Sequence, residues 1–326
     1  MDATGFAQAS LRTSTYAQYS RLWRKFADLA ASRGFVCLPV DARHCEVILS
    51  DFASETKSVS STQKMVAAVS FFHRLHNFQP PLSTARGRLV LRGITRAFSK
   101  PVRRAPPLTP DIVKTAIYYQ IGSDLDRSAN FAVPLLTWRT VAQLVLSFSA
   151  LARYHCLTNI FVTDVVFINS GVQLTFWNTK TDVLNQGQKV FVSPVPNSFA
   201  CPVRFLAAYM FRLNWEAFPY VGPLFPGLTA PQGARGFSSL PPNPRAFSKQ
   251  GATLAMRRHL MHIGVPNASS FTLHSGRRGG ATQAALGGCD FLAIKRQGRW
   301  ASDSCPQMYI DEAATLQSNF SSFLGL

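Results

Sequence analysis

A basic, proline-rich stretch near residue 100 divides this chain into two parts with different hydrophobic patterns. Residues 100–107 are KPVRRAPP, and prolines at this density favour an extended connector over packed structure. Helical periodicity alone precedes the stretch, whereas both helical and strand-like patterns follow it. We therefore predict a helical domain over residues 1–100, a linker over 101–108 and a second domain over 109–326.

In the first part, apolar residues recur at spacings of three and four positions, as on the buried face of an amphipathic helix. They predict a helix that begins near Ser14 and further helices over 47–54, 63–76 and 87–98. Beyond the linker, Thr109 followed by proline is typical of a helix start. The apolar run over 133–151 predicts a buried helix.

The second part contains three short strand-like segments joined by turn residues, which predict a small antiparallel sheet. The segments are 165–168, 172–177 and 189–195. Helical periodicity returns at 203–215, 249–263, 275–286 and around Phe291 and Gln307, and a loop rich in Pro and Gly spans 218–245. The expected fold class is mostly α with a small antiparallel β-sheet (α+β).

The charge of the chain indicates a polyanionic partner. Its 326 residues include 34 Lys+Arg and 16 Asp+Glu, a formal charge of +18, yet 47% of the residues are hydrophobic, as in a folded protein. Basic residues exceed acidic ones in both parts. Nucleic acid is the leading partner, because Lys and Arg that contact phosphates release condensed counterions, and an anionic membrane surface is the alternative.

A membrane-spanning or secreted protein is disfavoured. There is no apolar run of 18 residues, and the first residues lack a basic and then apolar signal segment. The six cysteines are scattered without a CxxC pair, which favours an intracellular, reducing location. A zinc site built from His73, His76, Cys37 and Cys45 matches no finger spacing, so we expect neither a metal nor a cofactor.

The densest chemical signal lies in the last sixty residues. The motif TLHSGRRGGAT covers 272–282, GRWAS covers 298–302, and Tyr309 follows. On a helix, His274 and Arg277 lie on one face, and the two glycines after Arg278 allow another backbone to approach closely. Such residue types suit phosphoryl transfer.

This ordered set resembles the tyrosine recombinase (phage integrase) family. His274 and Arg277 match its HxxR box, Trp300 matches its His-or-Trp position, and Tyr309 matches its nucleophile. Trp300 follows Arg277 by 23 residues, and Tyr309 follows Trp300 by 9. The family also has a first arginine that follows an apolar helix, and Arg153 matches it. A lysine in the turn between strands two and three is matched by Lys180, 27 residues later.

The resemblance implies how such a site acts. Tyr309 would attack a DNA phosphate and form a 3′-phosphotyrosyl link, the arginines would stabilise the phosphorane-like transition state, and Lys180 would protonate the leaving 5′ oxygen. His274 would assist proton transfer, and Trp300 would pack or hydrogen-bond at the phosphate. The family also implies a homotetramer on two duplex DNA sites. In the tail, Phe320, Phe323 and Leu324 complete either this protomer's core or a neighbour's.

The chain departs from the family at Cys156, where an acidic residue is usual, and by carrying Arg278 after the box arginine. Two alternatives therefore stay open: a type IB topoisomerase, which relaxes supercoils, and a recombinase-derived DNA-binding protein that has lost catalysis. A mobile element is the expected origin, and the location is nuclear if the host is eukaryotic and otherwise cytoplasmic. Besides the site, seven arginines are expected to contact DNA: Arg86, Arg88, Arg92, Arg96, Arg103, Arg104 and Arg278.

Overall fold

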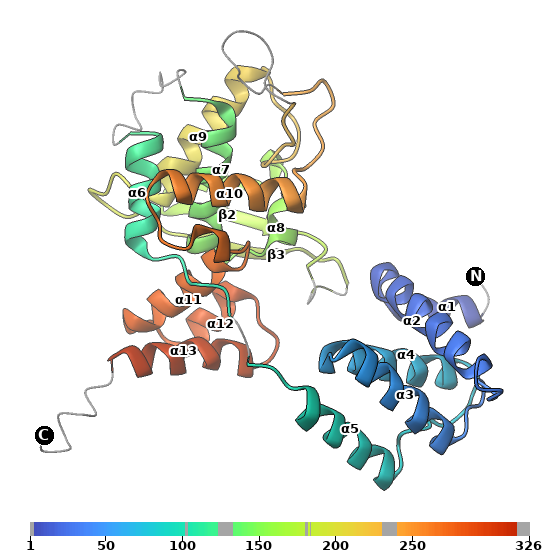
Figure 1. Ribbon diagram of the computed structural model, residues 1–326. Helices are drawn as coiled ribbons and strands as arrows, with labels where there is room; N and C mark the ends of the chain where they lie inside the picture. Colours follow the sequence, from blue (N-terminus) through green and yellow to red (C-terminus); the bar gives the residue numbers. More distant parts are fainter. Residues whose placement is uncertain are drawn as a thin grey trace, which may run out of the picture. The chain divides into compact units, whose positions relative to one another are not determined.

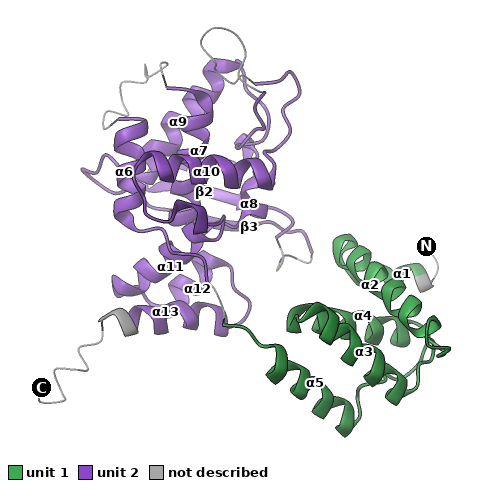
Figure 2. Ribbon diagram, viewed as in Figure 1, with its two compact units in different colours: residues 1–103 green, residues 104–326 purple. Residues whose placement is uncertain are grey.

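The chain divides into two compact units, residues 1–103 and 104–326 (Figure 2). The computed structural model describes residues 3–101, 104–122, 133–179, 182, 184–229 and 240–317 (Figure 1). Helices dominate, and the described strands form one three-stranded antiparallel sheet. The predicted fold class is confirmed.

The first unit is built from helices only, within the residues described. They are α1 (Ala3–Ala9), α2 (Thr13–Ala31), α3 (Ala42–Thr56), α4 (Val59–Leu75) and α5 (Ala85–Phe98). Side-chain caps set several of the starts: Asp41 accepts from the backbone of Arg43, Ser58 from Ser61 and Thr84 from Gly87. Such caps satisfy backbone N–H groups that have no partner inside the helix. The helices are longer than their predicted cores, and α1 was not predicted.

The core of this unit joins α2, α3 and α4 around buried aromatic and aliphatic side chains, among them Phe26, Leu49 and Met65. His73 belongs to the same interior. Its Nε2 accepts from the backbone N–H of Val40 at 3.0 Å, and its Nδ1 lies 2.8 Å from the carbonyl oxygen of Val69. Both ring nitrogens therefore contact the backbone inside the unit. In the described part of the chain, no three His, Cys, Asp or Glu side chains gather where they could hold a metal ion.

The second unit packs helices against a small sheet (Figure 1). Its elements are α6 (Pro110–Gln120), α7 (Leu135–Ser149), α8 (Tyr154–Thr158), β1 (Val165–Ile168), β2 (Gly171–Phe176), β3 (Gln188–Val192), α9 (Pro202–Glu216), α10 (Lys249–His262), α11 (Ser275–Leu286), α12 (Phe291–Gly298) and α13 (Ser304–Gln317), with two short 3-10 turns at Val162–Asp164 and Ala268–Ser270. All three predicted strands are present, and α6 begins at the Thr109 cap as expected. Among the α-helices described in this unit, only α8 was missed.

The sheet has the order β1-β2-β3 and is antiparallel throughout. Val165 pairs with Leu174, and Leu174 pairs with Val190 on the other side, so the three side chains lie on one face. All three are buried, because successive side chains of a strand point to opposite faces and only one face meets the core.

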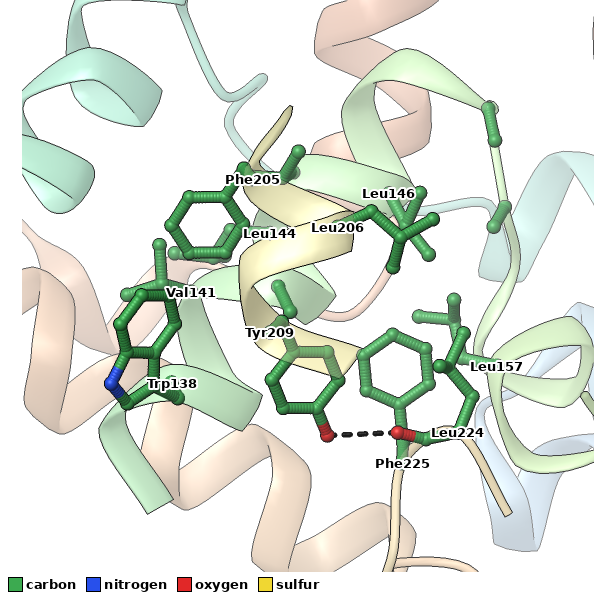
Figure 3. Close-up of a cluster of buried hydrophobic side chains, with 14 of the residues drawn as sticks. Trp138, Val141, Leu144, Leu146, Leu157, Phe205, Leu206, Tyr209, Leu224 and Phe225 are labelled. Atoms are coloured by element: carbon green, nitrogen blue, oxygen red, sulfur yellow. Dashed lines mark hydrogen bonds between the residues drawn. The ribbon is translucent and has the colours of Figure 1, made fainter. Parts of the chain in front are cut away.

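Helix α7 is the central element of the larger core. Figure 3 shows its Trp138 beside Phe205 of α9, with ring centroids 5.4 Å apart, and Tyr209 of α9 near Phe225. The fully buried Tyr209 hydroxyl donates to the Leu224 carbonyl oxygen at 2.8 Å, which satisfies a polar group that would otherwise be costly to bury. Among the described helices, none combines the length and the apolar character that crossing a bilayer requires.

Residues 104–108, which the sequence pattern assigns to the linker, lie in the second unit. Leu108 is buried, and its backbone N–H donates to the Ser275 carbonyl oxygen at 2.9 Å. A Cβ added at Gly279 would lie 1.8 Å from the Leu108 carbonyl oxygen. The glycine of α11 thus makes room for the chain as it enters the unit.

Candidate active site

Helix α11 packs closely against the end of α7 because glycines face it. A Cβ added at Gly276 would lie 1.9 Å from Ser147 Oγ, and one at Gly280 would lie 2.0 Å from the Phe148 carbonyl oxygen. Any larger residue would push the two helices apart. This contact fixes the first turn of α11, which carries Arg277, against the chain that leaves α7.

Arg277 is buried and bonded to backbone carbonyls at two distant points of the chain. Its Nη1 donates to the Leu151 oxygen and its Nη2 to the Gly298 oxygen, both at 2.5 Å. Burial, and next the charges of Arg153 and Arg299, lower the pKa of Arg277 to about 9. The guanidinium therefore keeps its charge at neutral pH, and its partners are dipoles that leave this charge uncompensated.

Trp300 and Tyr309 continue the site from Arg277 outwards. The Arg277 guanidinium carbon lies 4.0 Å from the centroid of the Trp300 ring, a cation–π contact. Tyr309 lies on α13, and the centroid of its ring is 5.6 Å from the centroid of the Trp300 ring. Burial raises the pKa of Tyr309, while the Arg277 charge opposes this shift. The structure thus brings three of the predicted site residues together.

Arg153 and His274 belong to the same cluster. Arg153 occupies the N-cap position of α8, directly after the turn that ends α7. His274 precedes α11, and its pKa is lowered by partial desolvation first and then by the charges of Arg153, Arg277 and Lys249. The Arg153 charge also acts on Tyr309, so the electrostatic influence of this arginine covers the whole cluster.

One predicted site residue, Lys180, lies outside the described residues, as do Arg103 and the tail positions Phe320, Phe323 and Leu324.

No protein-family model matches the sequence. An integrase/recombinase XerD homolog from Selenomonas ruminantium is 25% identical over 317 residues, which cover 96% of this chain and 85% of the relative. The Tn1549 transposon integrase, solved with transposon right-end DNA, superposes with a TM-score of 0.58 at 10% identity, covering 96% of this chain and 98% of that one. A lambda integrase dimer bound to a core site gives 0.51 at 15% identity, covering 93% and 90%. In sequence and in fold, the chain is similar to site-specific recombinases and integrases of the tyrosine recombinase type.

A second buried arginine, Arg299, supports this site beside Arg277, and sequence reasoning did not single it out. Its Nη1 donates to the Ala150 oxygen and its Nη2 to the Leu151 oxygen, both at 3.2 Å. The same Nη2 lies 3.9 Å from the Cys156 sulfur. The departure from the family at Cys156 therefore places a thiol against this guanidinium. The only sequence signal for Arg299 is its position directly before Trp300.

Leu151 is the residue on which these bonds converge. It is a non-glycine residue with φ 47°, a left-handed conformation that costs energy for an L-residue. Its carbonyl oxygen accepts from both Arg277 and Arg299. The two arginines thus hold the strained turn that delivers Arg153 two residues later.

The arginines predicted to contact DNA differ in their surroundings. Arg86 bonds to the buried Glu46 at 2.8 Å, whereas Arg88, Arg92 and Arg96 are exposed at four-residue spacing along α5, one side of that helix. Arg104 is exposed. Arg278 is largely buried and paired with Glu312.

We expect Arg299→Met to destabilise the second unit by about 1–3 kcal/mol, because the Ala150 carbonyl oxygen loses its bond from Arg299 and the Leu151 oxygen keeps only the bond from Arg277. Denaturant unfolding of the variant should show a lower midpoint than the wild type. The matched control is Arg296→Met, which removes the same charge from an exposed position of α12 and should leave the midpoint unchanged. Equal midpoints for both variants would contradict the supporting role of Arg299.

The lowered pKa of His274 predicts a neutral ring at neutral pH. The ring gains its proton only as the pH falls through this lowered pKa, so its titration midpoint in the free protein should lie below 6.5. NMR titration of the histidine ring signals measures this midpoint, and His274→Gln identifies which of the 7 histidine signals is lost. A midpoint at or above 6.5 would contradict the lowering of this pKa by burial and by the neighbouring positive charges.

Proposed function

We propose that this protein is a DNA recombinase that cuts and rejoins duplex DNA at specific sites through a covalent 3′-phosphotyrosyl intermediate on Tyr309. The observation that carries the proposal is the contact series from Arg277 to Trp300 to Tyr309, in which a buried cation and a half-buried phenol meet across one indole ring. A phosphate placed there would face both a nucleophile and fixed positive charge.

In the proposed cleavage, the Tyr309 oxygen attacks phosphorus and its proton passes to a base. The raised pKa of Tyr309 means that the phenol is protonated at neutral pH, so a base is needed. His274, whose pKa is lowered, is neutral there and suits that role. The bond from phosphorus to the 5′ oxygen breaks, and Lys180 donates a proton to that oxygen as it leaves.

Arg153 and Arg277 would stabilise the charge that develops on the non-bridging oxygens. Arg277 is held by backbone carbonyls on one side, so its position is set before DNA arrives. Fixed charge in a partly dry site stabilises a transition state without reorganisation during the reaction. Trp300 packs against the guanidinium and limits the access of water to it.

Duplex DNA is the proposed partner. The charge of +18 supplies affinity for phosphates, and the exposed arginines of α5 and Arg104 would contact the backbone. The similar XerH recombinase, with a TM-score of 0.54 at 11% identity over 88% of this chain and 73% of that one, was solved in a post-cleavage complex with its difH substrate. We further propose that a homotetramer assembles on two DNA sites, as the family resemblance implies.

The phosphotyrosyl bond conserves the energy of the phosphodiester that it replaces. A 5′-hydroxyl of a second DNA can therefore reverse the step on a new partner, and the exchange needs neither ATP nor a metal ion.

Incubation with a nicked suicide duplex should trap a covalent protein–DNA adduct. Tyr309→Phe should abolish the adduct, because the variant retains the ring that packs on Trp300 but lacks the attacking oxygen. Denaturing gel electrophoresis of labelled DNA measures the yield of the adduct. An adduct of equal yield in the variant would reject Tyr309 as the nucleophile, and DNA binding without any adduct in the wild type would favour the non-catalytic alternative.

The role of Lys180 can be tested through the leaving group. We expect Lys180→Ala to slow cleavage of ordinary DNA by roughly 100-fold or more, as loss of a general acid does. A substrate with a 5′-bridging sulfur should restore the rate, because a thiolate leaves without protonation, its conjugate acid having a pKa of about 8.5. Persistent loss on the sulfur substrate would assign Lys180 another role. The control is Lys189→Ala, which removes a lysine of β3.

A further inference from the structure

Arg278 directs its guanidinium towards the helix that carries Tyr309. Its Nη2 lies 2.5 Å from Glu312 Oε1, and its Nε lies 3.3 Å from Glu312 Oε2, a two-point contact with one carboxylate. Its Nη1 donates to the Ala105 carbonyl oxygen at 2.5 Å. All three nitrogens are thus engaged within the protein, which differs from the DNA contact expected from the sequence.

The neighbouring arginines of α11 face different surroundings. Successive residues of a helix point in different directions, so Arg277 contacts Trp300 while Arg278 reaches α13. Glu312 follows Tyr309 by three positions on α13, which places both on the same side of that helix. The Arg278–Glu312 ion pair therefore acts on α13 within one turn of the nucleophile.

The ion pair is sheltered enough to fix a position. The side chains of Arg278 and Glu312 are only 16% and 21% exposed, so water screens them less than a surface pair. A bidentate guanidinium–carboxylate contact also restrains orientation, not only distance. The bond to Ala105 fixes the plane of the guanidinium from its third side.

We propose that Arg278 is a positioning residue that, through Glu312, holds α13 so that the Tyr309 oxygen faces the scissile phosphate. This inference rests on the proposed function of Tyr309. Misplacement of a reacting group by about 1 Å lowers a rate by roughly 100-fold. Loss of the ion pair should therefore slow the cleavage step while leaving the affinity for DNA intact.

The experiment measures three quantities for Arg278→Ala, Glu312→Ala and the double variant: the rate of adduct formation at saturating nicked DNA, the Kd for uncleaved DNA, and the thermal midpoint. We expect each single variant to lose roughly 100-fold in rate and the double variant to lose no more, because the two side chains act as one unit. The Kd of Glu312→Ala should stay within about twofold of the wild type. Glu312→Gln, which keeps an acceptor and the side-chain shape, should retain an intermediate rate.

The matched control is Glu216→Ala. It breaks the Arg212–Glu216 ion pair of α9, another sheltered pair of the same unit, with side chains 9% and 27% exposed. Its cleavage rate should equal that of the wild type, so a loss confined to the Glu312 variants is not a general effect of removing a buried ion pair. If Arg278→Ala does not fold, Glu312→Gln and Glu312→Ala carry the test.

Two results would overturn the proposal. The first is that Glu312→Ala cleaves saturating DNA at the wild-type rate. If, in addition, only Arg278→Ala binds DNA more weakly, Arg278 contacts a DNA phosphate instead. The second is that the rate losses of the two single variants multiply in the double variant, because the two side chains would then act independently. Absence of an adduct in the wild type would instead reject the proposed function, and this inference with it, which separates the two failures.

Discussion

The Leu151 carbonyl oxygen is the point on which the site depends. Two guanidiniums, of Arg277 and Arg299, donate to it, and both belong to segments more than a hundred residues further along the chain. Burying a charge without an opposite charge is costly, and hydrogen bonds to carbonyl dipoles offset part of that cost. The dipoles carry no net charge, so the positive potential of Arg277 stays available for a phosphate. A carboxylate partner would satisfy the arginine equally well but would also reduce this potential.

The close packing of α11 on α7 makes that arrangement possible. Glycines at Gly276 and Gly280 remove the side chains that would separate the helices, and the Arg277 side chain can then reach the turn after α7. The same approach brings Leu108 against Gly279, which places the entering chain beside the site. The glycines in the HSGRRGG motif therefore have a packing role as definite as the chemical role proposed for its histidine and first arginine.

Local patterns in the sequence were sufficient to predict most elements and the fold class. The three strands follow from β-branched and aromatic runs between turns, and α6 follows from Thr109 and Pro110. Helix α8 was missed because its five residues are too short to show a period. The family-like spacing gave a set of candidate site residues, and in the structure the Arg153 charge helps to lower the pKa of both His274 and Arg277. Arg299 could not be predicted, because nothing in its local sequence shows that two carbonyls distant in the chain converge on it.

The two consecutive arginines of α11 show why residue type and motif position alone do not define a role. Arg277 and Arg278 have the same chemistry and adjacent places, yet one contacts an indole ring and backbone dipoles while the other contacts a carboxylate. The partner decides what each charge can do. Because its partners are backbone dipoles, the Arg277 charge remains available for the phosphate of the proposed reaction. Matched by Glu312, the Arg278 charge is largely compensated, and what it contributes is the geometry of α13. A site that must attract an anion and also orient a nucleophile needs both kinds of pairing, and this helix supplies them one residue apart.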